Sequence, residues 1–409
     1  MKWSPQQDQA LQSIKKWFGA REPLYKLFGY AGTGKTTLAK TIAEDVGGNV
    51  IFAAYTGKAA YVLQQKGCIG ASTIHSLCYH TADKSKEKLL ELKQALAEVV
   101  DQLQRQGDDL AGSKEVLKLK RDIDKEELEL SKPFFRVNHD SVVKSADLVI
   151  IDECSMVGKQ MGQDLLDFGT PILVLGDPAQ LPPVGDGGFF TLGKPHMMLS
   201  EIHRQAADNP IIRIATDIRK GNKLQYGKYG DSAVIQRAEI QQDMATQVDQ
   251  ILVGRNNTRR ACNNRIRELG GNTDPLPVVN DKLVCLRNNY DEGFLNGSLW
   301  RVADVGYHDD SYVELTVLPD TVEAKSNGIE TMAHRSIFEG KDLKMPWWDR
   351  KLADEFDYGY ALTCHKAQGS QWDDVLIFDE SAAFKANRTN WLYTAVTRAA
   401  EKVTIVKGY

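Results

Sequence analysis

The sequence predicts an α/β protein built on mainly parallel sheets that helices cover on both faces. Short apolar runs alternate with helical patterns from residue 23 to 80, and the alternation returns in the second half of the chain. Its 409 residues correspond to two to three domains at about 150 residues per domain. With 42% hydrophobic and 26% charged residues, the composition is that of a globular protein and excludes a wholly disordered chain or a fibrous rod.

The charge and the cysteines narrow the possible functions. The chain carries 51 lysines and arginines against 55 aspartates and glutamates, a net charge of −4, so nucleic-acid binding would need a local basic surface. No apolar run approaches the ~20 residues that span a bilayer, and residues 1–12 lack signal-peptide features, so we expect no membrane association. The six cysteines form no C-x-x-C pair, which indicates reduced thiols in a cytoplasmic protein.

The first part of the chain supplies a strand–helix series. Residues 24–28 form an apolar run that predicts a buried strand, and a glycine-rich loop and a helix over 35–46 follow. A second strand is expected at 50–54, with a helix from Lys58. Strands that alternate with helices in this way form parallel sheets.

Residues 81–131 interrupt the series with a segment dense in charged side chains. Leucines and valines recur at helical spacing on both sides of a break at 107–112, which predicts a helical hairpin that projects from the sheet domain. Packing between the two helices explains the apolar stripe, and a partner-binding site is the alternative.

The sheet pattern then resumes and is interrupted once more. A second strand–helix block runs from 211 to 269, and residues 282–357 predict a small all-β insertion in which Asn296-Gly297 signals a hairpin turn. The expected strands outside the insertion are 147–151, 171–175, 358–362, 375–378 and 402–406, and those inside it are 282–286, 299–305 and 312–318.

Residues 29–36 match the phosphate-binding pattern G-x-x-x-x-G-K-[ST] between a predicted strand and a predicted helix. The glycines let backbone N–H groups turn toward phosphates, and the helix N-terminus favours negative charge. Lys35 is expected to reach the β- and γ-phosphates, and the Thr36 hydroxyl is expected to bind Mg²⁺. We call residues 29–36 the phosphate loop; the pattern predicts a nucleoside triphosphate site.

Two carboxylates follow the predicted strand at 147–151. Asp152 is placed to hold Mg²⁺, and Glu153 is placed to orient or deprotonate a water that attacks the γ-phosphorus. This pair favours hydrolysis over transfer to an acceptor, because a kinase has to exclude water from the phosphate.

Six further strings lie in a fixed order along the chain. They are residues 54–60 (AYTGKAA), 72–77 (STIHSL), 175–184 (LGDPAQLPPV), 203–205 (HRQ), 363–370 (TCHKAQGS) and 393–398 (YTAVTR). The series resembles the ordered motif set of superfamily 1 helicases, and within them the RecD-like and phage Dda-like branch, which moves 5′→3′ along DNA. The resemblance covers nearly the whole chain except 81–131 and part of the β insertion.

The resemblance implies a fold of two RecA-like parallel-sheet lobes, with a helical hairpin inserted in the first and a small SH3-like β insertion in the second. The implied boundaries are 1–80 and 132–203 for the first lobe, 81–131 for the hairpin, 204–281 and 358–409 for the second lobe, and 282–357 for the β insertion.

The resemblance also assigns nucleotide-site roles. Gln7 matches an adenine-reading glutamine, with Gln6 as the alternative register, and Gln180 matches the residue that senses the γ-phosphate. Arg204 and Arg398 match two arginines that reach the γ-phosphate from the second lobe. The ATP contacts expected altogether are Gln7, Gly29, Ala31, Gly32, Thr33, Gly34, Lys35, Thr36 and Thr37.

Strand contacts are implied on both lobes. They are Thr56, Lys58, Thr73 and His75 on the first lobe and Thr363, His365 and Lys366 on the second. Hydroxyls and backbone N–H groups can hold phosphates without a basic patch, which suits the net charge of −4. Relatives usually have proline where this chain has Tyr55. The residue that splits the duplex stays open, and Trp347-Trp348 could either stack on bases or pack.

The resemblance therefore implies a DNA-stimulated ATPase that uses ATP and Mg²⁺ to move on single-stranded DNA and separate duplexes. A translocase that displaces proteins with little unwinding, a phosphotransferase and a nucleotide-dependent binding module are the alternatives. The implied partners are single strands and single/double-strand junctions without sequence preference, and room is left for single-strand-binding or replication proteins. We expect a monomer in the cytoplasm, or in the host cytoplasm for a viral protein.

Overall fold

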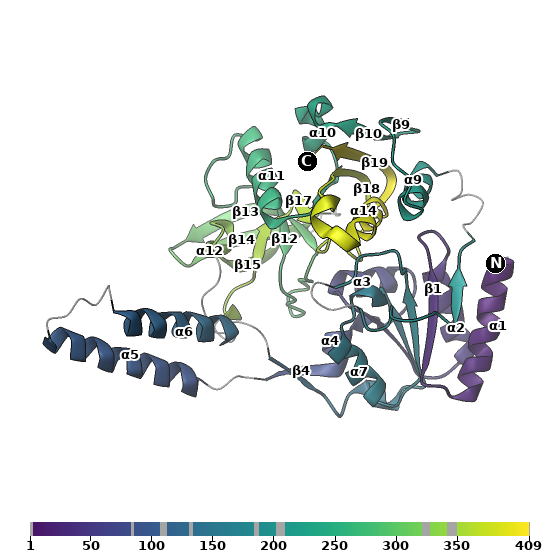
Figure 1. The fold of residues 1–409 in the computed structure, drawn as a ribbon, viewed down its shortest axis with the longest axis horizontal. Coiled ribbons are helices and arrows are strands. Elements are labelled where there is room, and N and C mark those ends of the chain that lie inside the picture. Colours follow the sequence, from purple (N-terminus) through teal and green to yellow (C-terminus); the bar gives the residue numbers. More distant parts are fainter. Residues whose placement is uncertain are drawn as a thin grey trace.

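The computed structural model describes residues 3–82, 86–106, 113–130, 134–183, 188–201, 209–320, 328–341 and 350–408. Figure 1 shows two α/β units, one above the other, with a pair of helices that extends to one side. We call the unit that contains β1 the first lobe and the unit that contains β19 the second lobe. The predicted α/β class with two parallel-sheet lobes is confirmed.

The first lobe contains a six-stranded sheet of order β3-β2-β6-β7-β1-β8, in which all neighbouring pairs are parallel. Its strands are β1 (Leu24–Gly29), β2 (Val50–Ala54), β3 (Ser72–Thr73), β6 (Leu148–Asp152), β7 (Ile172–Gly176) and β8 (Met197–Leu199). Parallel order brings the carboxyl ends of β1 and β6 to one edge, where the phosphate loop and the carboxylates follow.

Helices cover both faces of this sheet. Leu148 and Ile150 of β6 pack in one buried cluster with residues of α1, α2 and α3, whereas Val149 and Ile151 pack in another with residues of α4 and α7. Burial on both faces explains why the strand is apolar throughout instead of alternating. The helical elements are α1 (Pro5–Ala20), α2 (Lys35–Val46), α3 (Gly57–Gln65), α4 (Ile74–Cys78), η1 (Val142–Ser145), η2 (Cys154–Met156) and α7 (Lys159–Asp167).

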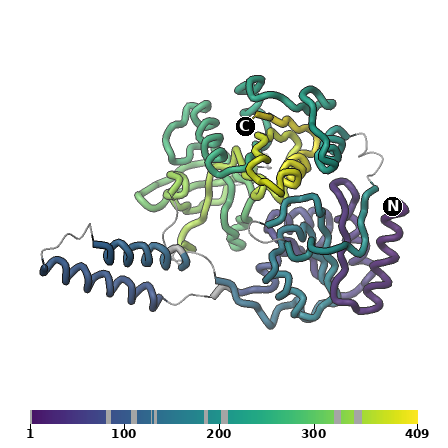
Figure 2. Tube along the Cα trace, in the orientation of Figure 1, coloured from purple at the N-terminus to yellow at the C-terminus, as the bar shows by residue number. Residues whose placement is uncertain are grey.

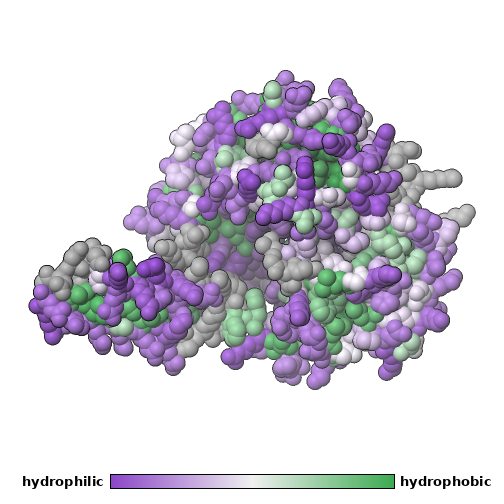
Figure 3. Space-filling view, viewed as in Figure 1, coloured by the Kyte–Doolittle hydropathy of each residue, from purple (hydrophilic) through white to green (hydrophobic). Residues whose placement is uncertain are grey.

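The helical hairpin consists of α5 (Glu87–Gln106) and α6 (Lys114–Leu130), which extend clear of both lobes (Figure 2). Leu89, Ile123 and Leu130 are buried between the helices, so packing accounts for these members of the apolar stripe. Figure 3 shows apolar side chains among hydrophilic ones on the hairpin. An antiparallel ribbon of β4 (Tyr79–Ala82) and β5 (Phe134–Val137) connects the hairpin to the first lobe.

The second lobe contains a sheet of order β17-β11-β18-β19-β10-β9, in which only the β9–β10 pair is antiparallel. Its strands are β9 (Gly227–Tyr229), β10 (Ser232–Gln236), β11 (Gln250–Val253), β17 (Ala361–Thr363), β18 (Trp372–Phe378) and β19 (Ala399–Lys407). Its helical elements are α9 (Pro210–Arg219), η3 (Arg237–Glu239), α10 (Gln242–Thr246), α11 (Asn256–Leu269), η4 (Ser381–Asn387) and α14 (Arg388–Val396).

The β insertion is an antiparallel sheet of order β15-β14-β13-β12-β16. It comprises β12 (Lys282–Cys285), β13 (Leu299–His308), β14 (Tyr312–Pro319), β15 (Ile329–His334) and β16 (Phe356–Tyr358), with α12 (Arg335–Phe338). The exact domain boundaries stay a prediction.

Two expectations about this region were wrong. The single strand expected at 358–362 is divided, because β16 pairs with β12 of the insertion whereas β17 pairs with β11 of the second lobe. Asn296-Gly297 does not join β12 to β13 as a two-residue turn. The connection spans 286–298, because residues 289 and 294 form a bridge of their own and the Gly297 N–H donates to the Cys285 carbonyl at 2.8 Å.

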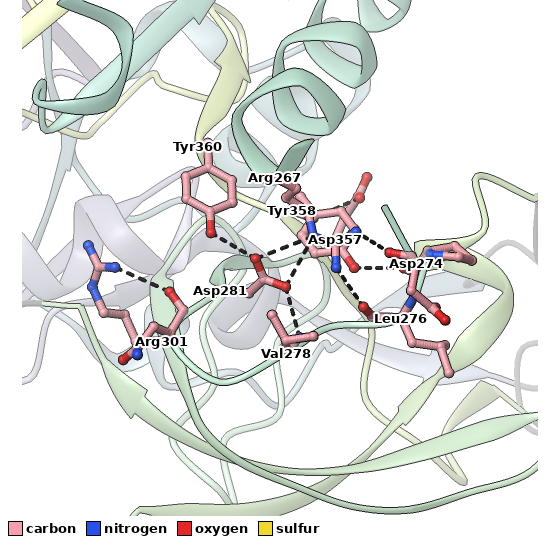
Figure 4. A network of polar contacts seen from close by, with 11 residues as sticks. Arg267, Asp274, Leu276, Val278, Asp281, Arg301, Asp357, Tyr358 and Tyr360 are labelled. Atoms are coloured by element: carbon pink, nitrogen blue, oxygen red, sulfur yellow. Dashed lines mark hydrogen bonds and ion pairs between the residues drawn. The ribbon is translucent and has the colours of Figure 1, made fainter. Parts of the chain in front are cut away.

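A buried ionic network attaches the insertion to α11 (Figure 4). The Arg267 guanidinium donates to Asp281 at 3.1 Å and lies 4.3 Å from the ring centroid of Tyr358. Asp281 also accepts from the Tyr360 hydroxyl at 2.8 Å and from the Val278 N–H at 2.9 Å. Both charges are buried and hydrogen-bonded, so removal of either partner would leave the other charge buried without its partner.

Candidate phosphate site and interlobe groove

Glycines shape the phosphate loop between β1 and α2. Gly32 and Gly34 have φ angles of 78° and 79°, a region that favours glycine. A Cβ on Gly29 would lie 2.6 Å from Oγ1 of Thr33, so this position also excludes a side chain. No side chain caps α2, and its first N–H groups are therefore available to an anion.

Lys35 and Thr36 are the first two residues of α2. The Lys35 ammonium donates to the carbonyls of Gly29 at 2.6 Å and Tyr30 at 3.2 Å, so it lies against the loop. The Thr36 hydroxyl donates to Oδ2 of Asp152 at 3.0 Å. This contact brings together the two side chains that were expected to bind Mg²⁺.

The oxygen donors of Thr36 and Asp152 fit a magnesium ion. Mg²⁺ takes one or two protein oxygens in addition to substrate phosphates and water. Among the residues that the structure describes, no group of three or more His, Cys, Asp and Glu side chains could hold a metal. A nucleotide-assisted Mg²⁺ site therefore matches the chemistry of these residues better than an all-protein metal site.

Glu153 occupies an unusual backbone position beside Asp152. Its φ is 52°, in the left-handed region, and its N–H donates to Oδ1 of Asp152 at 2.8 Å. Burial raises the pKa of the Glu153 carboxyl, and the positive charge of Arg398 opposes this shift. A carboxylate with a raised pKa is a better proton acceptor for an attacking water.

Arg398 ends the motif on the second lobe and lies near these carboxylates. It is buried, and its guanidinium donates to the carbonyls of Thr394 and Ser370 at 3.2 Å. Burial raises the pKa of the Asp177 carboxyl, and the positive charges of Lys35 and Arg398 are among the groups that oppose this shift. The guanidinium therefore lies close enough to the seam between the lobes to act on charges of the first lobe.

Of the two other γ-phosphate candidates, one is described. Gln180 is buried in the loop after β7, and its Oε1 has no hydrogen-bond partner among the described residues. An unpaired buried oxygen is costly, which makes the Gln180 Oε1 a candidate to accept a hydrogen bond from a water or hydroxyl. Arg204 lies in 202–208, outside the described residues. Trp347 and Trp348 lie in 342–349, which is also outside the described residues.

Gln7 contacts the phosphate loop directly. It is 3% exposed, forms a capping box with Ser4 at the start of α1, and donates from Nε2 to the Thr33 carbonyl at 3.1 Å. Gln6 instead accepts from the N–H groups of Ser200 and Glu201. The two glutamines therefore have different environments, and Gln7 is the one next to the loop.

The other loop residues differ in accessibility. Thr33 is buried, whereas Thr37 is exposed on α2. The Ala31 N–H donates to the hydroxyl of Tyr393, which comes from the second lobe, at 3.1 Å. The sequence analysis gave Tyr393 no role, although it opens the string 393–398.

A cavity of about 690 Å³ lies between the first lobe and the β insertion. We call it the interlobe groove. Its first-lobe wall includes Tyr55, Thr56, Thr73, His75, Tyr79 and Phe135, and its opposite wall includes Leu286, Arg287, Asn288, Tyr290, Asn296 and Arg350.

The two groove threonines are helix N-caps. The hydroxyl of Thr56 accepts from the Ala59 N–H at 3.2 Å, and that of Thr73 accepts from the Ser76 N–H at 3.1 Å. Thr73 also lies 3.1 Å from the Tyr290 hydroxyl, so the insertion reaches across the groove to the first lobe.

Aromatic rings gather around His75. The ring centroids of Tyr55, Tyr79 and Phe135 lie 5.7, 5.8 and 5.0 Å from that of His75. Burial lowers the pKa of the His75 imidazole, which favours its neutral form. The sequence analysis found His75 but missed the aromatic rings around it. Phe135 is distant in sequence, and Tyr55 was noted only because relatives usually have proline there.

The second-lobe candidates do not all lie in the groove. Lys366 donates to Oδ1 of Asn296, which lines the groove, at 3.1 Å. Thr363 is buried and accepts from the Lys366 N–H at 3.4 Å, whereas the His365 ring lies 5.7 Å from that of Phe384. On the first lobe, the Lys58 ammonium lies over the Trp372 ring in this structure. Its expected contact with a DNA strand stays a prediction.

Three further observations concern the cysteines, membrane-spanning helices and the position of the phosphate loop. All six cysteines lie in the described residues and are free thiols. In the described part of the chain, none of the helices is both long and apolar enough for a bilayer span. The phosphate loop and the carboxylates face a seam that the second lobe closes.

Family models match both ends of the chain. A model described as an AAA domain matches residues 2–239, more than half of the chain. A model described as the UvrD-like helicase C-terminal domain matches residues 358–406, which contain β17, β18 and all but the last residue of β19.

Curated relatives align along most of the chain. The ATP-dependent RecD2 DNA helicase of Deinococcus radiodurans is 28% identical over 407 residues, which cover 93% of this chain and 46% of the relative. Uncharacterized proteins of Methanocaldococcus jannaschii and Acanthamoeba polyphaga mimivirus are 24% and 23% identical over 93% of this chain, and cover 36% and 94% of those proteins. The chain thus spans less than half the length of the first two.

Solved structures share the fold. The Pif1 helicase from Candida albicans aligns with a TM-score of 0.52 at 17% identity. The alignment covers 100% of this chain and 95% of the Pif1 chain. Bacteroides Pif1 in complex with ADP-AlF3 and single-stranded DNA has a TM-score of 0.51 at 17% identity, with coverage of 99% and 92%. The C-terminal part of this chain is similar to the UvrD-like helicase C-terminal domain, and its fold is shared with Pif1 helicases. The AAA-domain match over more than half of the chain shows that the chain belongs to the AAA-domain family.

Proposed function

We propose that the chain is an ATP-dependent DNA helicase that moves 5′→3′ on single-stranded DNA and separates duplex strands. The observation that carries the proposal is the position of the phosphate loop. It faces Arg398 and Tyr393 of the second lobe across a seam, so that one nucleotide would touch both lobes.

The residues of the seam suit phosphate hydrolysis. Lys35 and the N–H groups at the start of α2 would bind the phosphates. Thr36 and Asp152 would hold Mg²⁺, which would supply positive charge to the phosphate oxygens. Glu153, with its raised pKa, takes the proton of the attacking water. Arg398, and Arg204 by resemblance, stabilise the transition-state charge.

Movement follows from the two-lobe arrangement. A nucleotide that is bound by both lobes stabilises the closed form, and its hydrolysis removes the charge that links them. Because a ligand shifts such an equilibrium only through its differential affinity, the strand has to be held with different strength in the two forms. The groove lies between the first lobe and the insertion carried by the second, where its width depends on closure.

The groove chemistry supports single-stranded DNA as the partner. Aromatic rings around His75 can stack on bases, and the hydroxyls of Thr56 and Thr73 can contact phosphates. Neither kind of contact depends on base identity. Binding to single/double-strand junctions, a monomeric state, a cytoplasmic location and contacts with single-strand-binding or replication proteins belong to the same proposal.

Unwinding of duplexes with either a 5′ or a 3′ single-stranded tail tests the proposal. With ATP and Mg²⁺, we expect separation of the 5′-tailed duplex only, and ATP turnover that rises strongly with added strand. Turnover that ignores the strand would contradict a motor.

The alternative is a translocase that displaces bound proteins with little unwinding. Streptavidin displacement from a biotinylated strand, without separation of the tailed duplex, would favour it. A phosphotransferase is less consistent with Glu153 and Arg398 beside the phosphate loop.

A further inference from the structure

The second lobe contacts the phosphate loop at two neighbouring residues. The Ala31 N–H donates to the Tyr393 hydroxyl at 3.1 Å. The Arg219 guanidinium, at the end of α9, lies 3.5 Å from the ring centroid of Tyr30. Since Arg398 takes part in neither contact, the second lobe touches this loop by a route separate from the catalytic arginine.

Tyr393 also binds a second segment of the first lobe. Its hydroxyl donates to Oδ2 of Asp177 at 2.6 Å, and the other carboxylate oxygen accepts from the Ala179 N–H at 3.0 Å. Asp177 is 1% exposed and Tyr393 is 2% exposed. A single hydroxyl thus accepts from the phosphate loop and donates to the segment that follows β7.

Residues 177–181, which we call the sensor segment, carry Gln180 and are held by α14 along their whole length. The Asn390 amide donates to the carbonyls of Ala179 and Gln180 at 3.1 Å. The Leu181 N–H donates to the Thr394 hydroxyl at 2.8 Å. The sensor segment belongs to the first lobe by sequence, but its hydrogen bonds join it to the second.

We propose that Tyr393 is a positioning residue that ties the phosphate loop to the sensor segment across the seam, so that docking of the second lobe sets the geometry of the hydrolysis site. The inference rests on the proposed function, because it assigns a role in ATP turnover. Tyr393 acts through Ala31 and Asp177 and needs no contact with the reacting atoms.

The chemistry of the hydroxyl suits this role. Burial and the neighbouring Asp177 raise the pKa of the Tyr393 phenol, so it stays protonated and remains a donor at neutral pH. A hydrogen bond to a buried charged acceptor is stronger than a neutral one, and loss of the Tyr393 hydroxyl removes the donor to Oδ2 of Asp177. Phenylalanine would keep the buried ring but lose both contacts.

Tyr393→Phe tests the proposal through turnover. We expect strand-stimulated kcat to fall roughly ten- to a hundredfold, as loss of a charged hydrogen bond implies, whereas the KM for ATP changes far less. Asp177→Asn should lower kcat as well, and the double variant should lose little more than either single one. The matched control is Tyr360→Phe, which removes a hydroxyl bonded to Asp281 at the junction with the β insertion.

Amide hydrogen exchange gives a readout that needs no turnover. Exchange at Ala31 should accelerate in Tyr393→Phe and stay unchanged in Tyr360→Phe, with similar thermal midpoints. Unchanged Ala31 exchange, wild-type kcat or fully additive losses would overturn the inference. Wild-type protein without ATPase activity would overturn the proposed function instead, and the exchange result would still decide whether the contact exists.

Discussion

The ammonium group of Lys58, on α3 of the first lobe, lies 5.0 Å from the ring centroid of Trp372 on β18 of the second lobe. A cation over an aromatic face is attractive, and this contact crosses the seam. Burial lowers the pKa of Lys58 to about 8, repulsion from Lys282 adds to the shift, and Asp320 opposes it. Lys58 is therefore a lobe-to-lobe contact in this structure.

This lowered pKa predicts a pH-dependent stability. The ordinary value of 10.5 applies to the unfolded chain, so between about 8 and 10.5 the unfolded chain binds more protons than the folded one. Stability should therefore rise with pH across that window. The thermal midpoint of wild type should rise relative to that of Lys58→Met as the pH increases from about 8 to 10.5. A difference between the two midpoints that stays constant with pH would contradict the lowered pKa of Lys58.

Lys35→Ala should abolish ATP hydrolysis and leave single-strand binding largely intact. The reason is that Lys35 lies against the phosphate loop and is not among the residues that line the groove. ATPase assays and strand-binding anisotropy measure the two properties. Lys40→Ala, an exposed lysine further along α2, is the matched control, and retained turnover in Lys35→Ala would count against the site.

Glu153→Gln should bind ATP but lose turnover by roughly 10²–10⁴-fold, the usual contribution of a general base. The amide keeps the shape of the side chain but cannot take the proton of water. Nucleotide binding measured by fluorescence should match wild type. Substantial turnover in this variant would point to another base, and Glu44→Gln on exposed α2 surface serves as the control.

Arg398→Ala should keep ATP affinity and lose hydrolysis by roughly 10³–10⁵-fold, as for arginine fingers in general. Because its guanidinium also bonds carbonyls of its own lobe, the thermal midpoint has to be measured in parallel. Arg398→Lys should rescue folding and only part of the rate. Equal loss of binding and hydrolysis, with a lowered midpoint, would mean that Arg398 is structural.

Phe135→Leu should weaken single-strand binding by about 1–3 kcal/mol, the usual contribution of one base stacked on an aromatic ring. Phe135 lines the groove and its ring lies 5.0 Å from that of His75. The loss should be similar for different base compositions, and ATP binding should not change. Tyr307→Leu, an exposed aromatic on β13, is the control. Equal effects of both variants would exclude a stacking role for Phe135.

Much of the fold and part of the site were predictable because they depend on local patterns. Apolar runs predicted the buried strands, and the spacing of glycines, Lys35 and Thr36 predicted the phosphate loop between β1 and α2. The division of residues 358–362 between two sheets was not predictable, because strand partners depend on contacts with β11 and β12 far away in sequence. The aromatic group around His75 was not predictable either, because the β4–β5 ribbon brings Phe135 to His75 from a distant part of the sequence.

The amino-acid order by itself determined the two strand–helix series, the phosphate loop and the carboxylates at the end of β6, since each depends on neighbours within a few residues. Only the tertiary structure decided that Tyr393 bonds Ala31 and Asp177, and that Lys58 meets Trp372. These contacts join segments hundreds of residues apart, and they form because two separately folded sheets dock along one seam.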